Sequence, residues 1–148
     1  MVKARKFFMA TVLTLLFSAL VASPLFAATS VSNWHTTLYG KNIREVGSSF
    51  YVTKGSYVTI KVDQYRMLTG YGDVDRNSNA NVKYELYNQW TNEIERSKSF
   101  HGNYGGAFGD PGEVTFYNLP EADYIVVITN NIDTPYGTAT GGNVYVSK

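Results

Sequence analysis

Apolar and polar residues alternate with a period of two over most of the chain that follows residue 27. In residues 57–63, Val58, Ile60 and Val62 share one side, and polar or amphipathic residues share the other. Successive side chains of a β-strand point to opposite faces, so this alternation predicts a half-buried strand. No long stretch repeats with the 3.6-residue period of a helix. Shorter alternating runs predict further strands at 50–52, 82–87, 94–100, 113–117 and 144–146.

Residues 123–129 form the most apolar segment of this region and are rich in β-branched residues, which predicts a central strand buried on both faces. Residues 54–56 are predicted to form a hairpin turn, and residues 130–142 a polar loop. About seven short strands separated by turn signals predict an all-β fold, a single antiparallel β-sandwich of the jelly-roll or immunoglobulin-like kind. The predicted core consists of Val58, Ile60, Val62, Tyr84, Leu86, Val114, Phe116, Tyr124, Val126, Ile128, Val144 and Val146.

The first 27 residues have the order of a secretory signal peptide. Lys3, Arg5 and Lys6 precede an apolar run of about 15 residues, and small residues follow it. That run is short for a helix crossing about 30 Å of hydrocarbon. We therefore expect cleavage after Ala27, a secreted domain of residues 28–148, and no membrane span in the mature form.

Composition narrows the classes of function. Loss of the three basic residues at the start leaves 10 basic against 12 acidic residues, a net charge of −2, and no basic cluster remains. Nucleic acid and anionic lipid are therefore not expected partners. The chain has no cysteine, which excludes thiol catalysis, iron–sulfur clusters and Cys-type zinc sites, and a cysteine-free exported protein is typical of a bacterium.

Several segments, in order, resemble the bacterial pre-peptidase C-terminal domain, a small β-sandwich found beside secreted proteases. The resemblance covers residues 48–147 and includes Leu119-Pro120 followed by Tyr124 and an apolar strand. Asp123 stands where that family usually has glycine, and the chain carries no catalytic partner. The resemblance implies a sandwich with a binding function and transfers no catalytic residues.

Aromatic side chains supply one candidate ligand-binding site, because aromatic rings stack on the faces of sugars. The candidates are Tyr87, Trp90, Tyr104 and Phe108, and the expected ligand is polysaccharide or cell wall. The alternative is that Trp90 and Phe108 fill the edge of the core. An exposed coplanar row of rings would favour the polysaccharide.

Two long loops, residues 70–81 and 101–112, supply the competing hypothesis. Binding residues are often carried by loops on a rigid scaffold. Here they would engage another secreted protein, as in a protease inhibitor, a toxin component or a matrix protein. A convex, glycine-rich loop tip would favour this alternative.

Asp73, Asp75 and Asn77 alternate in the first of these loops, as oxygen ligands of Ca²⁺ do in helix–loop–helix sites. That template requires Gly at its sixth position and Glu at its twelfth, but Ser78 and Tyr84 occupy those places. Asp and Asn also form ordinary turns, so a calcium site and a simple loop both stay open.

The sequence also predicts that the protein is not an enzyme. His35 and His101 are the only histidines and lie far apart in the chain, and no nucleophile motif is present. The enzyme alternative would need a pocket that gathers one histidine with a carboxylate.

Overall fold

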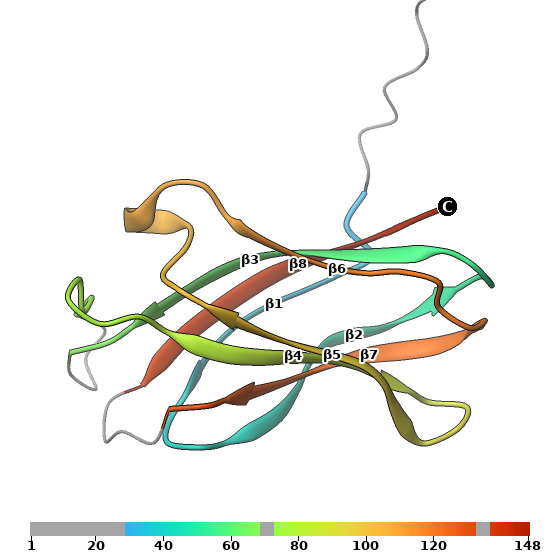
Figure 1. Ribbon diagram of the computed structural model, residues 1–148, viewed down its shortest axis with the longest axis horizontal. Helices are drawn as coiled ribbons and strands as arrows, with labels where there is room; N and C mark the ends of the chain where they lie inside the picture. Colours follow the sequence, from blue (N-terminus) through green and yellow to red (C-terminus); the bar gives the residue numbers. More distant parts are fainter. Residues whose placement is uncertain (1–28, 69–72, 133–136) are drawn as a thin grey trace, which may run out of the picture.

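The computed structural model describes residues 29–68, 73–132 and 137–148, so the predicted signal peptide lies outside the described residues. Within these ranges the chain is a β-sandwich of two antiparallel sheets packed face to face (Figure 1). Among the residues that the structure describes, the one helical element is a short 3₁₀ turn, η1. The elements are β1 (Ser32–Leu38), β2 (Ile43–Val52), β3 (Tyr57–Arg66), β4 (Asn81–Asn88), β5 (Glu93–His101), η1 (Gly106–Phe108), β6 (Gly112–Phe116), β7 (Ala122–Asn130) and β8 (Thr138–Ser147).

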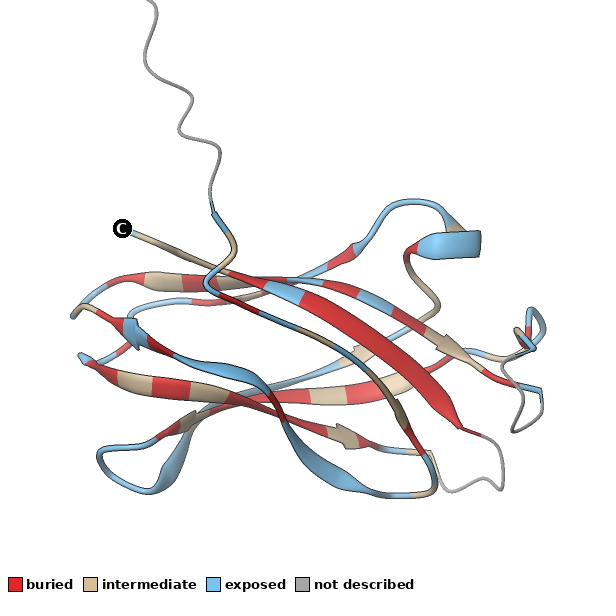
Figure 2. Cartoon of the chain, turned by 180° about the vertical axis from the view of Figure 1, so that it is seen from behind, coloured by how far each residue is buried: buried red, intermediate tan, exposed pale blue. Residues whose placement is uncertain are grey.

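One sheet has the strand order β1-β8-β3-β6, and the other has the order β2-β7-β4-β5. The fold class predicted from the alternation is therefore confirmed. The inward residues of both sheets form one core (Figure 2), and eleven of the twelve predicted core residues are buried. The twelfth, Val146, is partly buried against that core.

The turn at residues 54–56 is not a hairpin, because β2 and β3 belong to different sheets. Hydrogen bonds instead tie this turn to the β6–β7 connection: Gly55 N donates to Leu119 O at 2.9 Å, and Leu119 N donates to Ser56 O at 3.2 Å. Gly55 has a φ of 81°, which glycine adopts without steric cost. The chain thus arches from one sheet to the other at this point.

β7 is central in its sheet, as predicted, but the prediction that both its faces are buried is wrong. Asp123, Ile125 and Thr129 point to the outer face and are only half-buried, although Val127 is buried there. In the described part of the chain, no second layer covers that face. An antiparallel sheet can leave one side to solvent. A continuous apolar run therefore did not require burial on both sides.

The prediction of a loop over residues 130–142 is also wrong in its second half, since β8 begins at Thr138. A glycine in this part of the segment serves packing. The ring of Trp34 on β1 lies against Gly142, where any side chain would overlap it. Gly142 therefore makes room for an aromatic ring within a strand.

The leucine–turn–tyrosine sequence forms a corner. Leu119 is buried, and the hydroxyl of the buried Tyr124 donates to Pro120 O at 3.0 Å. A tyrosine hydroxyl bonded to the backbone a few residues upstream is a recurrent device of β-sandwiches. The corner fixes the start of β7, which carries part of the site described next.

Candidate functional site

The four predicted aromatic residues do not form one strip. Tyr87 and Trp90 lie at the turn that joins β4 to β5, whereas Tyr104 and Phe108 follow the opposite end of β5. β5, a strand of nine residues, separates the two places by about 30 Å. The loops that follow β3 and β5 lie together at one end of the sandwich in Figure 1, and the β4–β5 turn lies at the other end. We call residues 73–80 with 102–111 the loop end, and Tyr51, Trp90, Glu121 and Asp123 the turn end.

At the loop end, Asn103 joins the two predicted loops. Its Nδ2 donates to Ser78 O at 2.8 Å, and its Oδ1 accepts from Ala80 N at 3.0 Å and from Arg66 N at 3.4 Å. Gly102 N also donates to Ala80 O at 2.9 Å. One amide side chain therefore fixes the loop after β5 against both the loop before β4 and the end of β3. Residues 70–72 of the first predicted loop lie outside the described residues.

A polar network inside the sandwich holds the loop end in place. Gln64 is fully buried, and its amide donates to Phe100 O at 3.0 Å and to Gly102 O at 2.8 Å. Its Oε1 accepts from the Tyr84 hydroxyl at 2.7 Å, and Thr140 lies 3.1 Å from the same hydroxyl. Burial raises the pKa of Tyr84, so this hydroxyl keeps its proton and remains a donor. Gln64 thus links β3 of one sheet to β5 of the other through donors and acceptors that are all used.

The aromatic residues of the loop end pack on neighbouring rings. Tyr104 stacks on Phe100, with ring centroids 4.6 Å apart. Phe108 lies 6.1 Å from the ring of Tyr65, and the Arg76 guanidinium lies 5.7 Å from the Phe108 centroid. Arg76 comes from one loop and Phe108 from the other, so this contact is a second link between them. Tyr104 and Phe108 are both half-buried, and each packs its ring on a neighbouring ring, so they do not form an exposed row.

The three predicted calcium ligands lie in the described part of the first loop. The Asp75 carboxylate accepts from Asn77 N at 2.9 Å, and this bond, together with bonds from Ser78, lowers the pKa of Asp75. Asp73 O accepts from Leu68 N at 2.7 Å. Asp75 therefore closes a turn within its own loop. Within residues 29–68, 73–132 and 137–148, no three His, Cys, Asp or Glu side chains gather as metal ligands would. The calcium hypothesis stays a prediction.

At the turn end, Trp90 is 56% exposed and meets a residue that the sequence did not single out, Tyr51 of β2, which is 49% exposed. Their ring centroids are 6.3 Å apart, and the ring planes are inclined by 40°. Trp90 Nε1 donates to Asp123 Oδ2 at 3.0 Å, and the Tyr51 hydroxyl donates to Glu121 Oε1 at 2.5 Å. The bond to Glu121 raises the pKa of Tyr51. Tyr87 is half-buried, and its hydroxyl donates to Asn92 Oδ1 at 3.2 Å.

Tyr51 could have been found from the sequence. It lies between Phe50 and Val52, whose side chains point into the core, so the alternation places Tyr51 on the outer face. Asp123 likewise precedes the corner tyrosine. The feature of the sequence that could have identified Tyr51 is an aromatic residue at an outward position of a strand. Only the strand pairing shows that it lies opposite Asp123.

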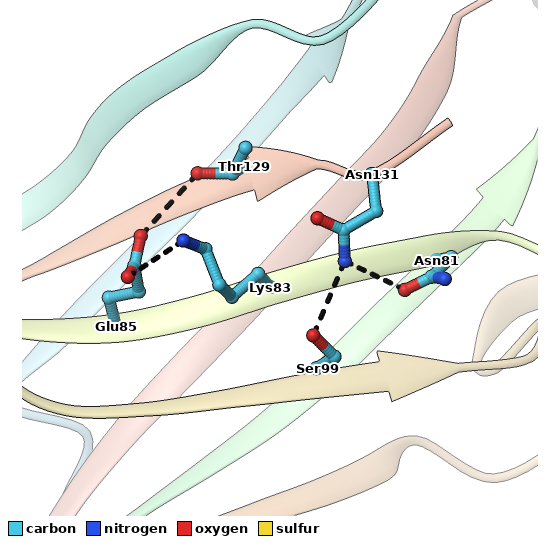
Figure 3. Close-up of polar contacts among 6 residues, drawn as sticks. All are labelled: Asn81, Lys83, Glu85, Ser99, Thr129 and Asn131. Atoms are coloured by element: carbon cyan, nitrogen blue, oxygen red, sulfur yellow. Dashed lines mark hydrogen bonds and ion pairs between the residues drawn. The ribbon is translucent and has the colours of Figure 1, made fainter. Parts of the chain in front are cut away.

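Between the two ends, the outer face of the β2-β7-β4-β5 sheet carries a polar network (Figure 3). The nearly buried Glu85 pairs with Lys83 at 3.0 Å and accepts from Thr129 at 3.5 Å. Asn131 donates to Asn81 Oδ1 at 2.9 Å and to Ser99 Oγ at 3.3 Å. These groups satisfy one another across β7, β4 and β5. This network therefore serves to hold β4, β5 and β7 together, and the candidate binding residues lie at the two ends of the face.

The histidines are not brought together. His35 lies on β1 beside Gly141, and His101 ends β5 in the other sheet. Both are exposed. None of the helical segments in the described ranges has the length and apolar character needed to span a membrane.

No family model matches the chain, and no curated protein matches it. Among solved structures, the chain is similar to a periplasmic inhibitor of g-type lysozyme from Aeromonas hydrophila, with 9% identity and a TM-score of 0.42 over 81% of this chain and 88% of that one. It is also similar to PirA, with 11% identity and a TM-score of 0.41 over 82% and 99% of the two chains. A Sulfurospirillum deleyianum protein shares 12% identity, with a TM-score of 0.41 over 78% and 98%. Likeness at this level assigns no family and no function to the chain.

Proposed function

We propose that this protein is a secreted, non-catalytic binding module that engages a partner protein through its loop end. The observation that carries the proposal is the contact of Asn103 with both loops, which makes one ordered surface from two segments of the chain. A surface that is ordered before binding loses less conformational entropy when a partner docks. The assignment to the outside of the cell is part of the proposal and comes from the predicted signal peptide.

The residues at the loop end suit a protein partner. Arg76 and Phe108 supply a guanidinium on an aromatic ring, and arginine and aromatic residues are enriched at the centres of protein interfaces. The tip around them exposes mainly small residues and backbone, so a partner can approach closely. Its exposed residues are Gly106, Ala107, Gly109, Asp110 and Pro111.

A polysaccharide suits the loop end less well. Tyr104 and Phe108 pack their rings on Phe100 and Tyr65, so they do not present a flat row of faces to a chain of sugars. The glycine-rich tip is the feature that we expected of a protein-binding surface. The loop end thus supports the interaction-factor hypothesis over the polysaccharide hypothesis.

A site-specific photo-crosslinker tests this proposal. With p-benzoyl-phenylalanine in place of the exposed Ala107, irradiation among the secreted proteins of the producing cell should give a discrete adduct. The matched control carries the same group in place of Thr91, an exposed residue at the other end, and should not give that adduct. Replacing both Arg76 and Phe108 by alanine should remove the adduct at position 107. Equal adducts at both positions would count against the loop end.

The non-catalytic part of the proposal has a separate test. Purified protein should show no activity in a broad hydrolase screen. Activity that disappears in His35→Ala or in His101→Ala would overturn it.

A further inference from the structure

The aromatic pair at the turn end is exposed but fixed in place. The Trp90 ring is held by its bond to Asp123, and its backbone N donates to Asn88 Oδ1 at 2.9 Å. Tyr51 is held by Glu121. The polar atoms of both side chains are bonded at the ring edges, and the ring surface that the two residues do not cover on each other remains open to a ligand. An exposed aromatic side chain normally loses rotamer freedom on binding, and here much of that loss is already met.

A groove continues from this pair. It has a volume of about 340 Å³, opens to solvent, and shares Glu121 with the turn end. The groove arises where the arch after β2 is hydrogen-bonded to the β6–β7 connection. Its lining residues are Lys54, Gly55, Asn118, Leu119, Pro120 and Glu121.

We propose that the turn end is a second binding site, which takes a neutral polysaccharide chain across Trp90 and Tyr51 and into this groove. A sugar ring has an apolar face that packs on an aromatic ring and hydroxyl groups around its edge that donate to carboxylates. Asp123 and Glu121 each use one oxygen on a ring and have a second oxygen for such donors. Leu119 and Pro120 add apolar surface in the groove.

The charge at the turn end selects among polysaccharides. Two carboxylates flank the rings, and the lining of the groove includes one cation, Lys54. A uronic acid placed on the rings would bring a third carboxylate beside Asp123 and Glu121, and like charges at close range repel. The site therefore discriminates against acidic sugars.

The inference goes beyond the proposed function, because it adds a ligand at the opposite end of the molecule. A module held on a polymer by its turn end would present its loop end to proteins that work on or near the same polymer. Such tethering raises the local concentration of the second partner without any new contact.

Co-sedimentation of the secreted form with insoluble cellulose, chitin and cross-linked polygalacturonate tests the site. We expect retention on at least one neutral polymer and no retention on polygalacturonate. Trp90→Ala and Tyr51→Ala should each weaken the association at least about tenfold, as loss of a central aromatic contact does. Trp90→Phe keeps an aromatic face and should weaken it less. Asp123→Asn keeps one acceptor oxygen, so it should weaken retention on the neutral polymer less than Trp90→Ala does, and it should raise the affinity for polygalacturonate.

Tyr39→Ala is the matched control, because Tyr39 is 47% exposed, close to the 49% of Tyr51, but directly follows β1, whose last residue, Leu38, pairs with Thr138. It should leave retention unchanged. Failure of every neutral polymer to retain the protein, equal loss in Tyr39→Ala, or stronger retention on polygalacturonate than on the neutral polymers would overturn the site. A protein adduct from the crosslinker at position 91 would assign the turn end to a protein partner and overturn it as well. Absence of the adduct at position 107 would count against the loop end without affecting co-sedimentation, and failed co-sedimentation would leave that adduct in place, so the two proposals can fail separately.

Discussion

The loop end and the turn end both present aromatic side chains, but the two ends are ordered in different ways. At the loop end, amide side chains hold the backbone: the buried Gln64 from within the core, and the half-buried Asn103 between the loops. At the turn end, carboxylates on the surface hold the rings themselves. The first arrangement couples the site to the stability of the whole sandwich. The arrangement at the turn end fixes only two surface side chains, so we expect the stability of the sandwich to depend little on it.

The largest effect that separates the ends is expected from Gln64→Leu. The substitution leaves two backbone carbonyls and the Tyr84 hydroxyl without their buried partner. Unsatisfied buried groups of this kind are costly, and we expect a loss of about 3 kcal/mol in the free energy of unfolding, measured by urea denaturation. Trp90→Ala is the comparison at the turn end and should change that free energy by less than about 1 kcal/mol. Equal losses in both variants would contradict the distinction.

Asn103→Ala should have an intermediate effect that stays at the loop end. It removes the acceptor of Ala80 N and the donor to Ser78 O, so we expect a loss of about 1–2 kcal/mol. Hydrogen exchange should become faster at the Ala80 amide, while amides of β7 keep their protection. Asn143→Ala, at an exposed position of β8, is the control and should leave both measurements unchanged.

A smaller effect is expected from acid. Because hydrogen bonds lower the folded-state pKa of Asp75 below its ordinary value of 3.8, the stability they add is complete above that value and is lost as the pH falls through the lower folded pKa. Asp75→Asn should remove this part of the acid sensitivity. Urea midpoints of the two proteins at pH 7 and pH 3 measure it. An unchanged pH dependence in the variant would show that Asp75 contributes nothing to it.

The smallest effect concerns calcium. If Asp73, Asp75 and Asn77 bind Ca²⁺, the melting temperature should be a few degrees higher in millimolar calcium than in chelator, because a ligand that binds only the folded state stabilises it. Asp75→Ala should abolish the difference. Equal melting temperatures for the unmodified protein in the two conditions would leave the loop as an ordinary turn.

The sequence predicted those strands whose own residues carry a recognisable pattern. β3 and β4 were found because their inward residues alternate, and β7 because its residues form an apolar, β-branched run. Neither signal needs knowledge of the partner strand. β1 was missed, and so was the first half of β8. The contact that explains both, the Trp34 ring on Gly142, joins residues 108 positions apart. A glycine that makes room for a distant ring has the same local sequence as a glycine in a loop.

The candidate sites likewise have features that single segments of the sequence indicate and features that only the fold creates. The sequence identified the two loops and Trp90, because glycine content and aromatic character are properties of single segments. It could not show that Asn103 joins the loops or that Tyr51 meets Trp90, because these contacts depend on which strands pair. The expectation of one aromatic strip from Tyr87 to Phe108 failed because it used distance along the chain, whereas β5 carries Phe108 to the far end of the sandwich.

The place of β8 in its sheet has a consequence for how the chain acquires its structure. This strand lies between β1 and β3, so β1 has its ladder partner only when β8 is present. The pairing of residues 32–38 with 138–144 is a long-range closure, and folds dominated by such closures form slowly. A ribosome completes residues 138–147 after every other strand of the sandwich. A nascent chain therefore cannot complete this sheet until β8 has been synthesised. If the predicted export signal is used, the chain would remain incompletely folded, and so able to cross a membrane, until that point.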